Sequence, residues 1–274
     1  MLIKVLPRPI LQAIGAGMGR LFFRIDRRHR ELTKKNLRET LGSDLIAVHV
    51  FEHFGRMVLD SIKLWSLHPD RLKQLFEVEG VEHMQAALSR GRGAVLFTAH
   101  YGNWEMGAVN AALLFGPMLI IARALDNRLL EKHLQAKREK IGNHVIEKRE
   151  SARPALRTLK SGHIVAILID QRVPANEGFA GTFLGRPAFT TPAAARLAQQ
   201  TGAGLVPGFC EPIHGSSRLR TVYLQEIPTT INGIQRPIAD IVQECNDVIS
   251  GFIRKRPELW LWMHDRWKIP ENES

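Results

Sequence analysis

Cysteine is scarce in this sequence: Cys210 and Cys245 are the only two among 274 residues. Two cysteines can neither build a disulfide framework nor supply the paired thiolates of a structural zinc site. The sequence therefore predicts a protein of a reducing compartment without a bound metal. Both cysteines lie late in the chain, outside any recognisable catalytic motif, and Gly-x-Ser-x-Gly is absent, so no serine or cysteine nucleophile is predicted.

Long hydrophobic runs are also lacking. The longest uncharged stretch near the N-terminus, residues 9–19, has eleven residues, whereas a membrane-spanning helix needs about 20. No signal-peptide cleavage site follows it. Instead Leu11, Ile14, Met18 and Phe22 recur at helical spacing. They predict a short helix that either lies in a membrane interface or packs on the protein as an ordinary terminal helix.

Positive charge, by contrast, is in excess. The 38 Lys and Arg outnumber the 27 Asp and Glu, for a formal net charge of +11. Acidic residues 26 and 31 are the only two within residues 20–38, which hold eight basic ones: Arg20, Arg24, Arg27, Arg28, Arg30, Lys34, Lys35 and Arg38. Beside an amphipathic segment, this cluster favours anionic lipid head groups as the partner, with a solvated charged face as the alternative. Nucleic acid is disfavoured, because zinc-finger spacing and RNP-like strands are absent and aromatics make up 7%.

The pattern of hydrophobic residues changes along the chain. Residues 1–75 show helical periodicity, whereas from Gly93 onward short apolar runs alternate with helical stretches. The runs span 94–99, 118–122, 164–169 and 205–209, and the helical stretches 104–114, 128–140, 152–159 and 192–200. This alternation predicts an α/β fold with a largely parallel central sheet flanked by helices and a helical N-terminal portion. We expect a helical membrane-interface portion (1–75) and an α/β core (76–274), integrated in one domain.

Polar clusters follow the first three apolar runs: His100 begins one, Arg123 the second and Asp170 the third. Functional groups of parallel sheets collect at the carboxyl ends of strands. Glu105 falls in the first turn of a helix expected to begin near Asn103, from which it could orient His100 and stabilise the imidazolium. Since no nucleophile accompanies the pair, His100 is predicted to act as general base directly on a substrate hydroxyl. A zinc role is disfavoured, because His-x4-Glu is not the two-His helical motif.

His100-x4-Glu105 after an apolar strand resembles the His-x4-Asp/Glu motif of glycerolipid acyltransferases. Its setting is similar to the bacterial lipid A late (lauroyl/myristoyl) acyltransferase family, which also includes phosphatidylinositol mannoside acyltransferases. The resemblance covers about residues 25–265. Four further stretches carry it: the basic segment 27–42, Arg123-x3-Asn127, Asp170-Gln171-Arg172, and the turn 182–188 with Thr191 and Pro192.

The resemblance implies a fatty acyl thioester of acyl carrier protein or coenzyme A as donor and a membrane glycolipid hydroxyl as acceptor, foremost a lipid A precursor. It implies no further cofactor, and a peripheral or monotopic place on the cytoplasmic face of the inner membrane. An acidic carrier protein suits the positive net charge. Asp170 is either a second orienter of His100 or a partner of an arginine. The oxyanion donor is expected to be either Asn103 or nearby backbone N–H groups. The other expected substrate-binding residues are Arg123 and Arg172 for phosphate, Phe183 for an acyl groove unless it is core, and Asn127, Asp170, Gln171 and Arg186.

The chain departs from the family pattern at its N-terminus, because members acting on lipid A commonly carry a transmembrane helix there. Alternative acceptors are therefore a phosphatidylinositol mannoside, a lysophospholipid or an aminolipid. A non-catalytic lipid- or carrier-binding protein and a thioester hydrolase are the remaining alternatives. The tryptophans Trp260, Trp262 and Trp267 form either an interfacial belt or part of the core.

Overall fold

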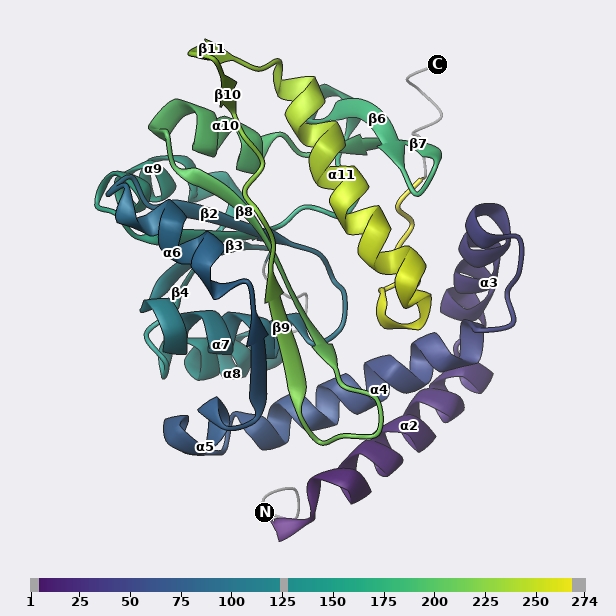
Figure 1. Ribbon diagram of the computed structural model, residues 1–274. Helices are drawn as coiled ribbons and strands as arrows, with labels where there is room; N and C mark the ends of the chain where they lie inside the picture. The colour runs from purple at the N-terminus through teal and green to yellow at the C-terminus, as the bar shows by residue number, and fades with distance from the viewer. Residues whose placement is uncertain (1–4, 124–127, 268–274) are drawn as a thin grey trace.

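The computed structural model describes residues 5–123 and 128–267 (Figure 1). Its α-helices are α2 (Arg8–Ile25), α3 (Arg27–Leu41), α4 (Ala47–Leu64), α5 (Pro69–Lys73), α6 (Val81–Ser89), α7 (Trp104–Phe115), α8 (Arg128–Glu139), α9 (Ala152–Lys160), α10 (Ala193–Thr201) and α11 (Ile238–Lys255). Its strands are β1 (Phe76–Glu79), β2 (Ala94–Thr98), β3 (Met118–Ala122), β4 (His144–Glu147), β5 (Ile164–Leu168), β6 (Phe179–Phe183), β7 (Arg186–Thr190), β8 (Gly204–Pro212), β9 (Leu219–Tyr223), β10 (Thr230–Ile231) and β11 (Ile234–Gln235). Short 3-10 turns are η1 (Lys148–Glu150), η2 (Ala175–Glu177) and η3 (Pro257–Leu259).

The central sheet has seven strands in the order β1-β9-β8-β2-β5-β3-β4. Strands β8, β2, β5, β3 and β4 are parallel to one another, while β9 is antiparallel to β8 and pairs in parallel with β1. The predicted α/β fold with a largely parallel sheet is therefore confirmed. Two small hairpins, β6–β7 and β10–β11, stand outside the sheet.

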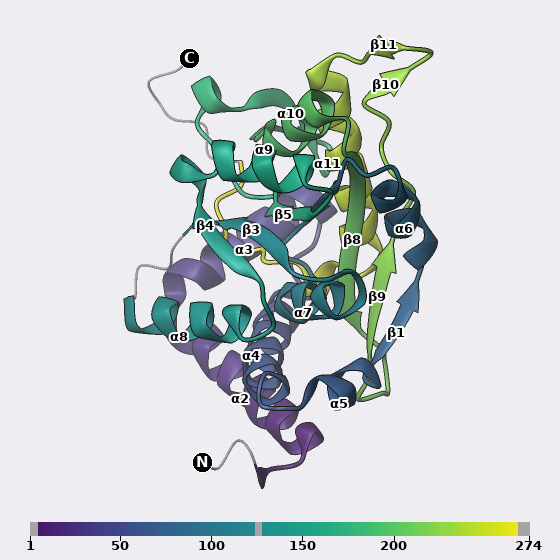
Figure 2. The ribbon, with the colours of Figure 1, turned by 90° about the vertical axis from the view of Figure 1, so that its left-hand side faces the viewer.

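Helices cover both faces of this sheet, as its apolar strands require. Alternate side chains of β2 enter different clusters: Val95 and Phe97 pack with α9, α10 and α11, and Ala94 and Leu96 pack with α6 and α7. Figure 2 shows α9 and α10 on one side of the parallel strands and α7 and α8 on the other. The cluster under α9–α11 also contains Leu37 and Phe51 of the N-terminal helices.

Helix α2 packs closely on α4 through glycines. A Cβ at Gly15 would lie 2.5 Å from the Gly55 carbonyl oxygen, and one at Gly19 would lie 2.1 Å from that of Phe51. The two backbones can approach this closely only because these positions lack side chains. Leu11 is buried in the same face. With this face, α2 packs on the protein as an ordinary terminal helix.

The opposite face of α2 is apolar and exposed to solvent. The exposed hydrophobic side chains recur every three or four residues, which places them in one stripe along the helix: Ile10, Ile14, Met18, Leu21, Phe22 and Ile25. We call these six residues the α2 stripe. Within residues 5–123 and 128–267, no helix is both long and apolar enough to cross a membrane.

Four short strands are absent from the prediction, and the burial of the C-terminal tryptophans decides between the two alternatives stated for them. Strands β1, β4, β6 and β7 were not predicted, because they are short and partly exposed and so lack a continuous apolar run. Trp260 and Trp262 are 1% and 0% exposed, so for these two the core alternative is confirmed.

Two alanine substitutions on α2 test its packing. Gly19→Ala is expected to lower the free energy of unfolding by about 1–3 kcal/mol, because its methyl group would overlap the Phe51 carbonyl. Gly17→Ala is the matched control: its Cβ would meet nothing within 4 Å, so the gain in helix propensity should stabilise the protein by up to about 1 kcal/mol. Urea unfolding followed by far-ultraviolet circular dichroism measures both. Stabilisation by both substitutions would contradict the close packing.

Candidate active site

The register of β2 and β5 brings His100 and Asp170 together. Thr98 lies opposite Leu168 in this parallel pair, and each of the two polar residues follows two positions later. The carboxyl ends of neighbouring parallel strands meet at one edge of the sheet. Residues seventy positions apart in the chain therefore become neighbours.

Asp170 receives three hydrogen bonds although it is 1% exposed. Its Oδ1 lies 2.8 Å from His100 Nδ1, and its Oδ2 accepts from the His100 backbone N–H at 3.0 Å and from Trp260 Nε1 at 2.7 Å. Burial by itself raises the pKa of the Asp170 carboxyl, but the contacts with His100 and Trp260 outweigh it and lower the pKa to about 2. The carboxylate is therefore ionised at neutral pH.

An ionised Asp170 also fixes the tautomer of His100. A carboxylate can only accept hydrogen bonds, so Nδ1 of His100 must carry a proton and Nε2 of the neutral ring holds the free lone pair. Nε2 lies 3.4 Å from the Gln171 amide nitrogen, and Trp104 meets the ring edge to face at 5.2 Å between centroids. The His100 side chain is 20% exposed, so the ring is accessible from outside.

Glu105 does not lie against the imidazole, which corrects the geometry expected from the sequence. Its carboxylate forms two hydrogen bonds with Arg138 in the last turn of α8, at 3.1 Å and 2.5 Å. The ion pair is largely buried, with side chains 11% and 14% exposed. The contact predicted for Glu105 is made by Asp170, and Glu105 instead joins α7 to α8. Of the two alternatives for Asp170, the one in which it lies against His100 describes this geometry.

The backbone N–H groups of the turn after His100 all donate hydrogen bonds within the protein. The N–H groups of Tyr101, Gly102 and Asn103 donate to the carbonyls of residues 99, 259 and 210, and that of His100 donates to Asp170. Glycine is required at position 102, because its φ is +62° and a Cβ would lie 2.0 Å from the Cys210 carbonyl oxygen. The four N–H groups are thus committed within the protein and none is available for an oxyanion.

His53 of α4 supports the same turn. The histidine lies with Nε2 3.1 Å from the Gly102 carbonyl oxygen, to which this nitrogen donates. Burial lowers the pKa of His53 to about 4, so the ring is neutral at physiological pH and the donated proton is that of one fixed tautomer. Sequence reasoning missed this contact, because His53 precedes Gly102 by 49 residues and lies on a different element.

The remaining predicted site residues lie in different surroundings. Asn103 is buried as the N-cap of α7: its side-chain oxygen accepts from Met106 N and Ser61 Oγ, both at 3.1 Å. Arg123 and Arg172 are exposed at the ends of β3 and β5. Asn127 lies outside the described residues.

Phe183 and Arg186 lie on the β6–β7 hairpin and contact the C-terminal segment. Phe183 is fully buried and packs against Trp260, with ring centroids 5.4 Å apart, so it fits the core alternative. Arg186 pairs with Glu39 of α3 at 2.5 Å and lies over the Trp267 ring. Neither side chain makes a described contact with His100 or Asp170.

The C-terminal segment contributes contacts that sequence reasoning missed. Besides Trp260, His264 accepts a hydrogen bond from the Arg172 N–H through Nε2 at 3.0 Å, and the Leu261 N–H donates to the His100 carbonyl at 3.0 Å. The one available signal was the dense tryptophan cluster, which indicated burial but not what it was buried against.

The site as a whole is equipped for general base catalysis. Both cysteines are buried. Burial raises the pKa of the Cys210 thiol to about 12 and also raises the pKa of the Cys245 thiol. Neither thiol is therefore ionised enough to act as a nucleophile. The arrangement offers an imidazole whose Nδ1 is held by an ionised carboxylate and whose Nε2 contacts the Gln171 amide, which suits the removal of a proton from a bound hydroxyl.

Comparison with known proteins identifies relatives of this chain. The sequence model of the family described as "Bacterial lipid A biosynthesis acyltransferase" matches residues 1–269. The lipid A biosynthesis lauroyltransferase of Escherichia coli is 25% identical over 97% of this chain and 88% of its own length. The lipid A biosynthesis palmitoleoyltransferase of the same organism is 25% identical over 98% and 89%. The phosphatidylinositol mannoside acyltransferase of Mycobacterium tuberculosis is 26% identical over 89% and 79%.

The lowered pKa of Asp170 predicts a pH-dependent part of the folding stability. The pKa of this carboxyl is about 2 in the folded state, below its ordinary value of 3.8. The ionised carboxylate therefore stabilises the folded state at pH values above 3.8, and this contribution is lost as the pH falls from 3.8 to about 2. Wild-type protein should therefore lose about 2 kcal/mol more unfolding free energy than Asp170→Asn over this interval. Urea unfolding at a series of acidic pH values measures the difference, and parallel curves for the two proteins would contradict it.

Proposed function

Since this chain belongs to the family of bacterial lipid A biosynthesis acyltransferases and is an acyltransferase, we propose that it transfers a fatty acyl chain from a thioester to a hydroxyl of a membrane glycolipid. The proposed donor is acyl carrier protein or coenzyme A loaded with the chain, and the proposed acceptor is a lipid A precursor. The observation that carries the mechanism is the hydrogen bond between His100 Nδ1 and Asp170, which leaves Nε2 as the base.

In this mechanism His100 Nε2 takes the proton of the acceptor hydroxyl while the hydroxyl oxygen attacks the thioester carbonyl carbon. The carbonyl π electrons move to oxygen, and when they return the carbon–sulfur bond breaks and the thiolate leaves. The imidazolium then gives its proton to the thiolate, so that the base is restored and no acyl-enzyme is formed. Asp170 stabilises the imidazolium in between, and general base catalysis of this kind contributes about 10²–10⁴-fold.

The tetrahedral oxyanion needs a donor that the turn 100–103 does not offer. Gln171 is the proposed source, because its amide nitrogen lies 3.4 Å from His100 Nε2 and so faces the point at which the hydroxyl would be activated. Arg123 and Arg172 follow strands on the same edge of the sheet. There they would bind a phosphate of donor or acceptor, since a guanidinium pairs with two phosphate oxygens.

A second acceptor is favoured by one comparison. The mycobacterial relative named for phosphatidylinositol mannoside is as similar to this chain as the two lipid A enzymes. The acceptor of this chain would then be a hydroxyl of a mannosylated phospholipid, with the same roles for His100 and Asp170.

The α2 stripe supports a place on the membrane surface, which we propose to be the cytoplasmic face of the inner membrane. The stripe residues are 42–69% exposed, and Arg24, Arg27, Arg28 and Lys35 are exposed nearby on α2 and α3. An apolar face flanked by cations suits the interface of an anionic bilayer. The protein would thereby meet its lipid substrates at the bilayer surface.

An assay of donors against acceptors tests the activity. Purified protein is incubated with acyl carrier protein or coenzyme A thioesters and with a lipid A precursor or a phosphatidylinositol mannoside, and the lipids are identified by mass spectrometry. His100→Ala should lower turnover by about 10²–10⁴-fold and Asp170→Asn by about 10²-fold or more, because each removes part of the base. The circular dichroism spectrum of each variant controls for folding.

The outcomes separate the proposals. Acylation of the mannoside alone would replace the acceptor and keep the mechanism. Thioester hydrolysis at an equal rate without acceptor would favour a hydrolase, and binding of thioesters without turnover would favour a binding protein. Normal turnover by folded His100→Ala would overturn the mechanism.

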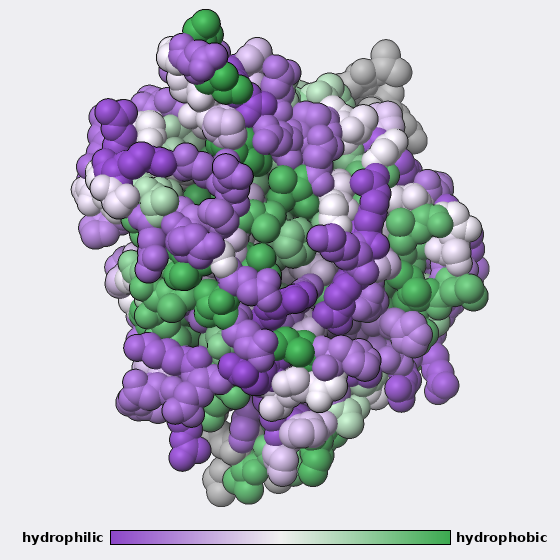
Figure 3. Space-filling model, viewed as in Figure 1, coloured by the Kyte–Doolittle hydropathy of each residue, from purple (hydrophilic) through white to green (hydrophobic). Residues whose placement is uncertain are grey.

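Vesicle co-sedimentation tests the membrane surface. Replacing Ile14 and Met18 together with serine should weaken binding to vesicles containing phosphatidylglycerol by about tenfold or more, because each large apolar side chain contributes on the order of 1 kcal/mol when buried. Ile234→Ser is the matched control: Ile234 is 73% exposed but lies on the β10–β11 hairpin, whose hydrophobic tip projects at the top of Figure 3. An equal loss for both proteins would contradict a specific role of α2.

A further inference from the structure

Trp260 directs its indole N–H at the carboxylate that holds the His100 ring. The hydrogen bond from Trp260 Nε1 to Asp170 Oδ2, at 2.7 Å, is shorter than the two bonds between Asp170 and His100. Trp262 is buried to the same degree, with 0% of its surface exposed against 1% for Trp260. Its Nε1 donates to a backbone carbonyl, that of Pro257, also at 2.7 Å. Of two equally buried indoles, one satisfies its N–H within its own segment and the other at the candidate active site.

The backbone of Trp260 is joined to the turn after His100. Two hydrogen bonds flank it: the Leu261 N–H donates to the His100 carbonyl at 3.0 Å, and the Gly102 N–H donates to the Leu259 carbonyl at 2.9 Å. This pattern is that of an antiparallel β-bridge. The backbone from which the indole extends is therefore fixed relative to the backbone of His100.

Aromatic rings surround the indole of Trp260. The distances between ring centroids are 4.8 Å to Trp262, 5.4 Å to Phe183 and 5.9 Å to Trp267. The guanidinium of Arg266 lies 4.9 Å from the Phe183 centroid and donates hydrogen bonds to the β6–β7 hairpin. A large ring packed in this way is held in one rotamer, so the direction of its N–H is fixed.

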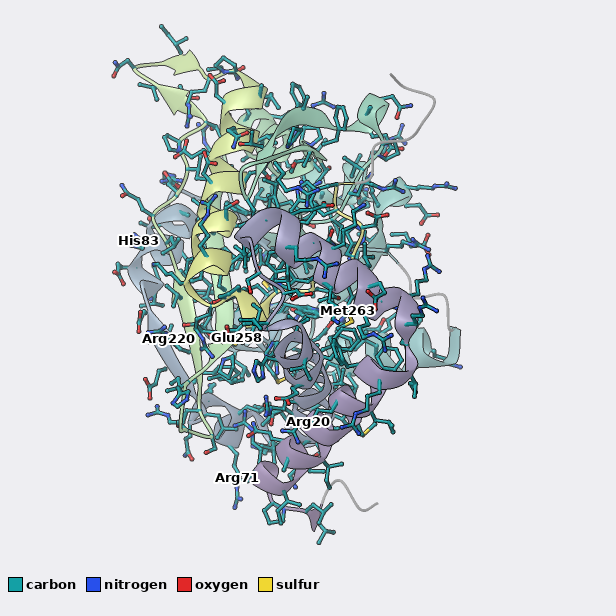
Figure 4. The ribbon with its side chains drawn as sticks, turned by 90° about the vertical axis from the view of Figure 1, so that its right-hand side faces the viewer. Arg20, Arg71, His83, Arg220, Glu258 and Met263 are labelled. Atoms are coloured by element: carbon teal, nitrogen blue, oxygen red, sulfur yellow. The ribbon has the colours of Figure 1, made fainter. Side chains whose placement is uncertain are left out.

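Helix α3 also holds the segment that carries Trp260. Asn36 is 2% exposed, and its Nδ2 donates to the carbonyls of Trp262 and His264, both at 3.0 Å. Met263, which lies between these two residues in the chain, stands in the angle between α2 and α3 in Figure 4. The segment is thus anchored by α3 as well as by the hairpin, and an anchored segment can define the geometry of a site.

Two N–H groups from separate segments determine how the Asp170 carboxylate is turned. Its Oδ2 accepts from the His100 backbone at 3.0 Å and from the Trp260 indole at 2.7 Å. Because both donors hold the same oxygen, Oδ1 is left facing His100 Nδ1 at 2.8 Å. Without the indole N–H, Oδ2 would lose one of these donors, and a buried carboxylate that lacks a donor turns towards whatever donor it can reach.

We propose that Trp260 is a positioning residue of the general base: its N–H holds the Asp170 carboxylate in the orientation that keeps the proton on His100 Nδ1 and the basic lone pair on Nε2. This inference rests on the proposed acyl transfer, in which Nε2 takes the proton of the acceptor hydroxyl. The hydrogen bond made by one ring nitrogen of a histidine decides which nitrogen carries the proton. Trp260 itself is buried and acts on the reaction through Asp170.

Trp260→Phe and Trp262→Phe form a matched pair. Each removes one buried indole N–H that is bonded at 2.7 Å and leaves a smaller ring, so both should lower the stability in urea unfolding to a similar extent. Trp260→Phe should lower kcat by about tenfold or more with little change in KM, because the lost bond to a charged group supports the chemical step. Trp262→Phe should leave kcat near the wild-type value.

Nuclear magnetic resonance of the His100 ring tests the proposal without acyl transfer. In protein with isotope-labelled histidine, the shifts of the two nitrogens of the neutral ring show which one is protonated, and the resonances missing from His100→Ala are those of His100. We expect the Nδ1–H tautomer in the wild type and in Trp262→Phe, and a mixture with the Nε2–H tautomer in Trp260→Phe. These spectra decide the role of Trp260 even if no acyl transfer is detected.

The outcomes separate a positioning role from a structural one. Equal losses of kcat in the two variants would overturn the proposal even if transfer is robust, and so would an unmixed Nδ1–H tautomer with wild-type kcat in folded Trp260→Phe. If Trp260→Phe does not fold, the benzothiophene isostere of tryptophan is placed at position 260, where sulfur replaces the N–H and the ring keeps its size. The same loss of kcat and the same mixed tautomer are then expected, and wild-type behaviour of this protein would overturn the proposal.

Discussion

The buried carboxylate of Asp170 is the group on which the active site depends. An ionised carboxylate is tolerated in the interior only when donors satisfy its oxygens, and here the donors are the ring and backbone of His100 and the indole of Trp260. The end of β2, the end of β5 and the C-terminal segment must therefore assemble around it together. Through this group, and through the bonds of Leu261 and His264 to the ends of β2 and β5, the C-terminal segment becomes part of the candidate active site.

The N-terminal helices connect that site to the outside of the molecule. Glycines let α2 lie against α4, and α4 in turn carries His53 to the turn that follows His100. The remaining face of α2 is apolar and largely exposed to solvent. Helix α2 thus packs with one face on α4, which supports the turn after His100, and presents an apolar surface with the other face.

Glu105 shows where reasoning along the sequence fails. Only four residues separate it from His100, and the first turn of a helix is near enough for a contact, so the pair was a natural prediction. In the structure a guanidinium from α8 binds Glu105 with two hydrogen bonds, and a fork of this kind is stronger than a single bond to a neutral ring. Arg138 could not be anticipated, because the packing of α8 against α7 is not encoded in either helix alone.

The sequence by itself determined the parallel strands, most helices, the family and the strand ends at which His100 and Asp170 occur, because apolar periodicity and local motifs are properties of neighbouring residues. Because both residues directly follow a predicted strand, residues 94–99 and 164–169, the sequence also made Asp170 an alternative partner of His100. Which carboxylate meets the imidazole was decided only by the tertiary structure. That choice depends on β5 lying beside β2 in a particular register, and the order and register of strands are set by contacts between segments far apart in the chain.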